Sequence, residues 1–202
     1  MIKAVIFDFG NVIGFFDYRR TTRRLAAETG LPEDFFLRHV FAADLEDEYE
    51  SGRITSAAFL QRIRNAVALQ LSDALLSEAY ADIFSPNPEV ASLVLQLKGR
   101  YRLLLGSNTN ELHANHFRRQ FADTLAHLDQ LVLSHEVGAR KPKAAFFQHC
   151  LKLADCAPNE AVFIDDLHRN VAGARAVGLH AVVYQGVDDL KQQLTDLGVD
   201  WS

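Results

Sequence analysis

The stretch Ala4-Val5-Ile6-Phe7-Asp8 decides the fold that we predict for this chain. Four consecutive apolar residues, with no polar residue between them, are typical of a strand that is covered on both faces of a parallel sheet. A carboxylate follows this strand directly, at the sheet edge where such folds bind their ligands. The stretch therefore predicts a buried strand with a candidate functional acid, Asp8, at its carboxyl end.

Similar apolar runs recur later in the chain, and helical periodicity occupies the sequence between them. The runs cover residues 102–105, 131–133, 161–164 and 180–184. The helical patterns cover residues 110–121, 143–153, 170–177 and 188–197. This alternation predicts an α/β fold with a doubly wound, mainly parallel sheet.

The sequence after the first strand departs from this alternation. Between residues 17 and 85 we find no convincing strand but four helical patterns, at 18–29 (closed by Gly30), 32–41, 55–69 and 72–84. Such a span is too long for a simple strand-to-helix connection. We expect a helical insertion over residues 14–86 and an α/β core formed by residues 1–13 and 87–202. Asn87 and Pro88 are typical of the start of the helix that returns to the sheet.

Composition and charge describe an ordinary globular protein. Of the 202 residues, 49% are hydrophobic and 23% are charged, which is enough apolar material for a substantial core. The net charge of -5 argues against a general binder of nucleic acids or anionic membranes. The N-terminal apolar run is much shorter than the roughly 18 residues of a membrane span, so we expect a cytoplasmic protein.

Polar residues stand at the ends of three predicted strands, and a lysine lies shortly before one of these strands. Ser107 and Asn108 follow the second strand, the pair Asp165-Asp166 ends the fourth, and Lys141 opens the helix before that fourth strand. Together with Asp8 they would converge on one edge of the sheet. Carboxylates suit a divalent cation and nucleophilic attack, while an ammonium and neutral donors suit phosphate oxygens. The set predicts phosphoryl-transfer chemistry.

These four positions, in this order, resemble the four motifs of the haloacid dehalogenase-like hydrolase superfamily. The first motif is the apolar strand that ends in Asp8, the second ends in Ser107, and the third is Lys141-Pro142. The fourth is Asp165-Asp166, with Asn170 four residues after the second acid. The resemblance implies that the helical insertion is a cap, and the continuation Gly10-Asn11-Val12 is similar to small bacterial sugar-phosphate phosphatases.

The resemblance also implies a role for each residue. Asp8 would attack phosphorus and form an aspartyl-phosphate, which water then hydrolyses. Asp8, Asp166 and the backbone carbonyl of Gly10 would bind Mg²⁺, the implied cofactor.

Other residues of the motifs would surround the substrate. Ser107, the Asn108 backbone and Lys141 would hold the phosphoryl oxygens of a small phosphorylated metabolite. Asp165 and Asn170 would order the loop around them. We expect the enzyme to be a monomer or a homodimer.

One position departs from the pattern of the phosphatases, which carry a second Asp two residues after the nucleophile. This chain has Gly10 there. Losing a general acid and base costs roughly 10² to 10⁴ in rate, unless the leaving group is good or another residue substitutes. The true dehalogenases also lack this Asp. Two alternatives therefore stay open, a 2-haloacid dehalogenase that uses Asp8 on carbon and a catalytically weakened protein that binds a ligand or a partner.

The insertion contains a basic cluster and an acidic run. The cluster comprises Arg19, Arg20, Arg23 and Arg24, and the run comprises Asp44, Glu46, Asp47, Glu48 and Glu50. We favour two solvated surfaces that attract each other over substrate binding by the arginines and proton transfer by the acids. Asp17, Glu48 and Glu50 are the acids that we would mutate first.

The histidines give little support for a metal site. His113 and His116 share a helix face but have no third ligand, so we interpret them as surface residues.

Overall fold

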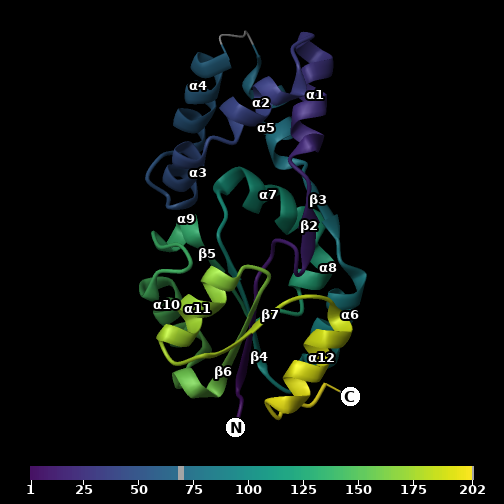
Figure 1. Ribbon diagram of the computed structural model, residues 1–202, viewed down its shortest axis with the longest axis vertical. Coiled ribbons are helices and arrows are strands. Elements are labelled where there is room, and N and C mark those ends of the chain that lie inside the picture. Colours follow the sequence, from purple (N-terminus) through teal and green to yellow (C-terminus); the bar gives the residue numbers. More distant parts are fainter. Residues whose placement is uncertain (68–70, 202) are drawn as a thin grey trace.

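A five-stranded sheet forms the centre of the computed structural model, which describes residues 1–67 and 71–201. Its strands are all parallel and stand in the order β5-β4-β1-β6-β7. They are β1 (Ala4–Phe7), β4 (Arg102–Ser107), β5 (Gln130–Leu133), β6 (Ala161–Asp165) and β7 (His180–Val183). The predicted α/β fold with a parallel sheet is confirmed, and β1 is its central strand (Figure 1).

Helices cover both faces of this sheet, which explains why its strands lack polar alternation. Val5 and Phe7 belong to an apolar cluster shared with α6 (Pro88–Leu97) and α12 (Val187–Asp196). Their neighbours Ala4 and Ile6 belong to a second cluster, shared with α10 (Ala144–Ala154) and α11 (His168–Ala176). Successive side chains of a strand point to opposite faces, so both sets are buried.

The remaining core helices connect the strands of one half of the sheet. They are α7 (Glu111–Gln120), α8 (Ala122–Leu125) and α9 (Ser134–Val137), and a single 3₁₀ turn, Pro158–Glu160, precedes β6. The Asn87 side chain accepts a hydrogen bond from the backbone N–H of Val90 and so caps α6, as predicted.

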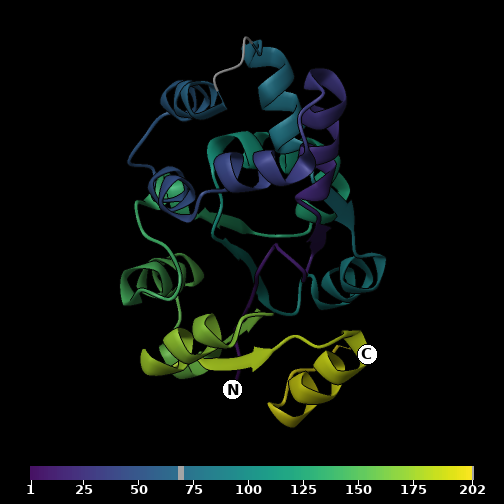
Figure 2. The ribbon, with the colours of Figure 1, turned by 45° about the horizontal axis from the view of Figure 1, so that its top comes forward.

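Five helices between β1 and α6 form a body with its own apolar cluster, which we call the helical segment. They are α1 (Arg19–Thr29), α2 (Glu33–Val40), α3 (Ala43–Glu50), α4 (Ser56–Val67) and α5 (Asp73–Ala81). Figure 2 shows these helices gathered at one end of the molecule, away from both termini. Gly30 ends α1 in the left-handed conformation, as predicted.

The structure corrects three predictions within this region. A short antiparallel pair joins β2 (Gly14–Phe16) to β3 (Phe84–Pro86), so strand begins at residue 84 and α5 ends at Ala81. Two three-residue strands so far apart in sequence carry no recognisable pattern. The acidic run lies in a helix, α3, that we did not predict. The end of the predicted helix 55–69 lies outside the described residues, within which α4 covers Ser56–Val67.

The boundaries of the insertion stay a prediction, at residues 14 and 86. Within the described ranges, no helix is both long and apolar enough to cross a membrane.

Candidate active site

The carboxyl ends of the central strands bring the predicted site residues to one edge of the sheet. Asp8 directly follows β1, Ser107 ends β4 and Asp165 ends β6, while Lys141 comes from the loop before α10. All four side chains are buried. Segments that lie far apart in sequence thus meet because neighbouring parallel strands end at the same edge.

Lys141 lies between two carboxylates at the centre of this group. Its Nζ is 2.6 Å from Oδ1 of Asp8 and 2.7 Å from Oδ2 of Asp165. Burial alone would lower the pKa of Lys141, but the two carboxylates raise it above its ordinary value. The two carboxylates therefore keep the buried Lys141 in its charged form.

Asn108 fixes the backbone of Lys141 through its side chain. Its Oδ1 accepts a hydrogen bond from the Lys141 N–H (2.8 Å), and its Nδ2 donates to the Lys141 carbonyl (3.0 Å). We predicted a role only for the backbone of Asn108, so this contact of its side chain is an addition to the predicted site.

Asp165 is a carboxylate with a full set of partners. It accepts hydrogen bonds from the Leu167 N–H (2.9 Å) and from Nδ2 of Asn170 (3.0 Å), in addition to its ion pair with Lys141. Since its oxygens are engaged within the protein, it orders the loop that leads to α11. Asn170 thus contacts Asp165, and the supporting role of the two residues stays a prediction.

Asp8 and Asp166 have the character of ligands for a hard cation. Carboxylate oxygens of Asp8, Asp165 and Asp166 lie within 4.8 Å of one another. Asp166 accepts a hydrogen bond from Nδ2 of Asn11 (3.0 Å), which orients it. Burial raises the pKa of Asp8 above its ordinary value despite the nearby Lys141. A divalent cation fits this cluster, because it would offset the repulsion between the carboxylates and because oxygen ligands suit Mg²⁺.

An aromatic ring lies beside Gly10, the position at which the sequence lacks a second acid. A Cβ added to Gly10 would lie 3.2 Å from Cε1 of Phe16 on β2. A side chain at this position would therefore press against the Phe16 ring. Glycine at position 10 and phenylalanine at position 16 are sterically matched.

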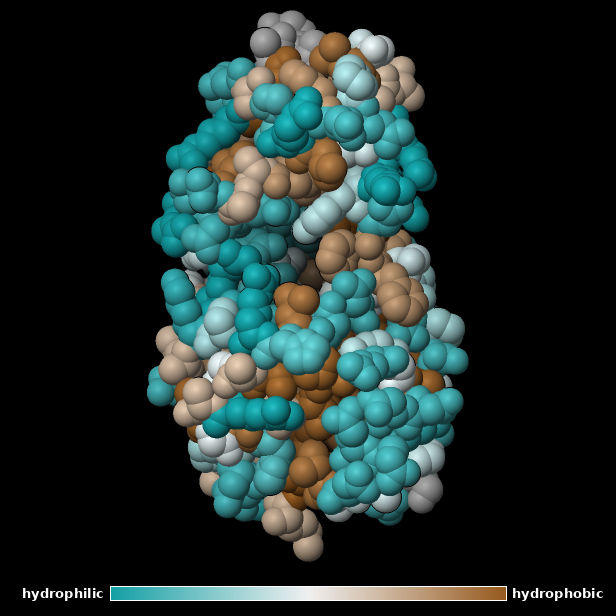
Figure 3. All heavy atoms as spheres, viewed as in Figure 1, coloured by the Kyte–Doolittle hydropathy of each residue, from teal (hydrophilic) through white to brown (hydrophobic). Residues whose placement is uncertain are grey.

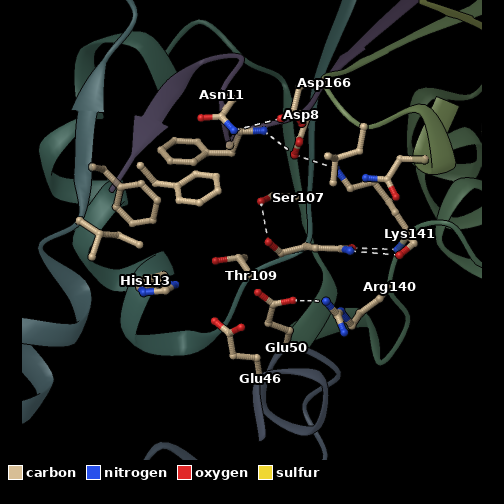
Figure 4. Close-up of a pocket in the computed structure, with 18 of the residues that line it drawn as sticks. Asp8, Asn11, Glu46, Glu50, Ser107, Thr109, His113, Arg140, Lys141 and Asp166 are labelled. Atoms are coloured by element: carbon tan, nitrogen blue, oxygen red, sulfur yellow. Dashed lines mark hydrogen bonds and ion pairs between the residues drawn. The ribbon is translucent and has the colours of Figure 1, made fainter. Parts of the chain in front are cut away.

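Most of these residues, but not Asp165, line a cavity of about 260 Å³, which opens between the core and the helical segment. Figure 3 shows the molecular surface hollowed at this level. Asp8, Ser107, Lys141 and Asp166 form what we call the core end of the cavity. Tyr18, Glu46, Glu50 and Arg140 also line it and form what we call its far end. In the view of Figure 4, Thr109 lies between Asp8 and the two glutamates.

Arg140 connects the core to the helical segment. It forms ion pairs with Glu50 and Asp47, both on α3. Its Nε is buried and has no hydrogen-bond partner among the described residues. The residue that precedes the central Lys141 therefore holds α3 over the cavity.

A second contact between these bodies is made by a single hydroxyl. Oγ of Ser134 accepts a hydrogen bond from the Thr109 N–H (2.9 Å). The Ser134 hydroxyl can donate to either of two carbonyl oxygens, that of Glu50 at 2.6 Å or that of Thr109 at 2.9 Å. Ser134 is fully buried at this junction.

Only one of the three acids that we singled out reaches the cavity. Glu50 lines it, whereas Glu48 pairs with Arg62 on α4. Asp17 accepts a hydrogen bond from the Arg19 N–H at the start of α1. Glu46, which we named only as part of the acidic run, lines the cavity too. The signal that sequence analysis missed is the spacing of four between Glu46 and Glu50, which puts both on one helix face.

The basic cluster of α1 does not pair with the acidic run. Arg20 pairs with Asp82, Arg24 with Glu78 and Arg23 with Glu33. These pairs lie within the helical segment and its border, so the arginines stabilise that body and do not attract α3.

His113 is not a surface residue, contrary to our interpretation. It is buried, its ring stacks on Tyr80, and its Nε2 donates to the Tyr80 carbonyl (3.1 Å). Burial lowers the pKa of His113 to about 3, so the ring is neutral. It packs the helical segment against α7, which also explains why a histidine stands there.

Comparisons with known proteins agree with this fold. The family model described as haloacid dehalogenase-like hydrolase matches residues 2–178. A D-ribitol-5-phosphate phosphatase of Bacteroides thetaiotaomicron is 25% identical, and the match covers 96% of this chain and 98% of that protein. A glyceraldehyde 3-phosphate phosphatase of Methanopyrus kandleri is 26% identical, over 90% of this chain and 83% of that protein.

A solved structure of a related enzyme is also similar to this chain in fold. It is a HAD family enzyme of Bacteroides thetaiotaomicron in complex with magnesium and inorganic phosphate, with 25% identity and a TM-score of 0.77. The match covers 100% of this chain and 98% of that one. With the family model spanning most of the sequence and the four motifs meeting at one cavity, this chain belongs to the haloacid dehalogenase-like hydrolases.

Proposed function

We propose that the protein hydrolyses small phosphomonoesters, sugar phosphates among them, with Mg²⁺ as cofactor and Asp8 as nucleophile. The observation that carries this proposal is the meeting of Asp8, Lys141 and Asp166 at one end of a single cavity. The named phosphatases among the relatives, and the magnesium and phosphate complex of a neighbour, support it.

In this mechanism a carboxylate oxygen of Asp8 attacks the phosphorus. The new bond joins that oxygen to phosphorus, the ester bond breaks, and the alcohol leaves with a proton that it takes from the solvent or from the cavity wall. Water then attacks the aspartyl-phosphate, which releases inorganic phosphate and restores Asp8. Splitting one difficult displacement into two steps is the gain from covalent catalysis.

The neighbouring residues neutralise and orient the phosphoryl group. The Nζ of Lys141 reduces the repulsion between Asp8 and an anionic substrate, and the hydroxyl of Ser107 and the N–H of Asn108 donate to phosphoryl oxygens. Asp8, Asp166 and the Gly10 carbonyl would hold Mg²⁺, which supplies positive charge to the phosphoryl oxygens when bound.

The two alternatives rest on Gly10. A 2-haloacid dehalogenase would use Asp8 to displace halide from carbon, and a weakened enzyme would bind its ligand without turnover. The cluster of Asp8 with Asp165 and Asp166 favours the phosphatase, because displacement of halide from carbon has no need for a cation site.

Phosphate release from p-nitrophenyl phosphate and from a panel of phosphorylated metabolites tests the proposal. We expect turnover with Mg²⁺, loss of turnover with EDTA, and loss of at least about 10³-fold in Asp8→Asn. The exposed Asp123→Asn, on α8, is the matched control and should keep wild-type activity. Metal-independent turnover, or full activity of Asp8→Asn, would contradict the proposal. Metal-free halide release from a 2-haloacid would favour the dehalogenase.

A further inference from the structure

Glu46 stands out at the far end of the cavity because it has no cationic partner. Its neighbours on α3, Asp47 and Glu50, form ion pairs with Arg140. Among the described residues, no ion pair includes Glu46. Its carboxyl group interacts by hydrogen bonding with the Tyr18 hydroxyl. A half-buried carboxylate that lines a cavity without a cation has capacity left for a ligand.

The environment of Glu46 also supports a role in binding. Burial and the charge of Glu50 raise the pKa of Glu46 to about 7, while the Tyr18 hydroxyl and Arg140 act in the opposite direction. Near neutral pH this carboxyl group can accept a hydrogen bond in one protonation state and donate one in the other. In Figure 4 it lies on the side of the cavity away from Asp8, where the part of a substrate remote from phosphorus would lie.

The remaining walls limit the size and character of that part. Phe9, Phe16 and Phe84 line the cavity with apolar surface, on which the C–H groups of a carbon chain can pack. Its volume of about 260 Å³ lies just below the range of roughly 300 to 1,000 Å³ that is common for ligand pockets. The cavity suits a phosphate attached to a few carbons, with polar groups on one side.

We propose that Glu46, together with Tyr18, binds hydroxyl groups of the leaving alcohol and so restricts the enzyme to phosphate esters of neutral polyols and sugars. This inference rests on the proposed phosphatase function and assigns its specificity to α3. A leaving group with its own carboxylate is rejected, because Arg140 at the far end is already paired with Asp47 and Glu50, so that Glu46 and Glu50 would repel a further negative charge there.

A matched pair of substrates tests the inference. Glycerol 1-phosphate and 3-phosphoglycerate differ chiefly in a hydroxymethyl group against a carboxylate, and p-nitrophenyl phosphate offers no hydroxyl. We expect wild-type kcat/KM to favour glycerol 1-phosphate over 3-phosphoglycerate by at least about 10-fold. Glu46→Gln keeps the shape, removes the charge, and should reduce this preference to a few-fold or less.

Removal of the hydrogen bonds gives a second readout. In Glu46→Ala and in Tyr18→Phe, the ratio of kcat/KM for glycerol 1-phosphate to that for p-nitrophenyl phosphate should fall, by about 10- to 100-fold in the former. Asp44→Asn, an exposed residue of the same helix, is the control and should leave both ratios unchanged.

The outcomes separate this inference from the function on which it rests. Turnover of p-nitrophenyl phosphate, combined with similar kcat/KM for the two glycerol derivatives, would overturn the inference alone. The same holds if Glu46→Gln leaves the preference at its wild-type size. No magnesium-dependent turnover of any ester would overturn the phosphatase function and the inference with it.

Discussion

The two ends of the cavity hold acids in opposite situations. Directly behind the core end, Asp165 is fully buried and its oxygens accept hydrogen bonds from Lys141, Leu167 and Asn170. At the far end, Glu46 is half-buried and lacks a cation. A buried charge is tolerated only where partners compensate for lost hydration. Hydrogen bonds and ion pairs within the protein therefore already position the core end, whereas the far end keeps one acid available for a substrate.

The strongest way to break the order of the core end is to remove its cation. Lys141→Met leaves Asp8 and Asp165 as buried carboxylates without their common partner, which should lower the free energy of unfolding by about 3 to 5 kcal/mol. Activity should fall by at least about 10²-fold. Urea unfolding in EDTA measures the first effect, with the exposed Lys152→Met as control. Unchanged stability would mean that the carboxylates do not depend on Lys141.

A gain of function tests the match between Gly10 and Phe16. Gly10→Asp restores an acid beside the nucleophile, and its φ is not positive, so the backbone accepts a side chain. Combined with Phe16→Ala, which clears the ring at 3.2 Å, it should raise kcat on poor leaving groups by about 10- to 100-fold. Gly10→Asp alone should gain less. The steady-state rate of phosphate release gives kcat for both variants. An equal kcat in both would show that Phe16 does not hinder the aspartate side chain introduced at position 10.

The far end makes a prediction about pH. The pKa of Glu46 is about 7 in the folded protein and near 4.5 when unfolded, so the folded state holds the proton longer and loses stability as pH rises between these values. The groups that face Glu46 are Tyr18, Tyr80, Glu50 and Arg140. Above pH 7, the free energy of unfolding of Glu46→Gln should therefore exceed that of wild type by about 1 to 3 kcal/mol. Below pH 4.5 the two proteins should differ little. A constant difference across this range in thermal melts would contradict the assignment.

The smallest expected effect concerns the connection between the two ends. Arg140→Lys keeps the charge but loses the fork that binds Asp47 and Glu50 together, at a cost of about 1 kcal/mol in unfolding free energy. Because α3 is held less firmly over the cavity, KM should rise more than kcat falls. Arg62→Lys, which changes a surface pair with Glu48, is the control. An effect on kcat alone would place Arg140 at the chemical step.

The same contrast explains how much the sequence predicts. The strands β1, β4 and β6 are predictable because burial on both faces leaves uninterrupted apolar runs, and each strand contains or is closely followed by a residue of the core end. The far end has no such marker. The role of Glu46 depends on which face of α3 meets the core, and α3 itself is an acidic stretch of weak periodicity that only tertiary contacts hold as a helix.

The short pair of β2 and β3 illustrates the other failure. Its strands are separated by the whole helical segment, and each has only three residues. No local pattern announces such a pair, yet it brings Phe16 to Gly10. The residue that matches the missing acid is therefore visible only in three dimensions.

The hydroxyl of Ser134 has a consequence for any displacement of α3 from the core. One proton cannot serve the carbonyls of Glu50 and Thr109 at the same time, so one acceptor is always in reserve. If α3 moves away from the core, Ser134 turns to Thr109 and stays satisfied, while water reaches the exposed Glu50 carbonyl. Such a displacement would therefore leave no buried donor unsatisfied at Ser134, and its cost would lie in the two ion pairs that join Arg140 to α3.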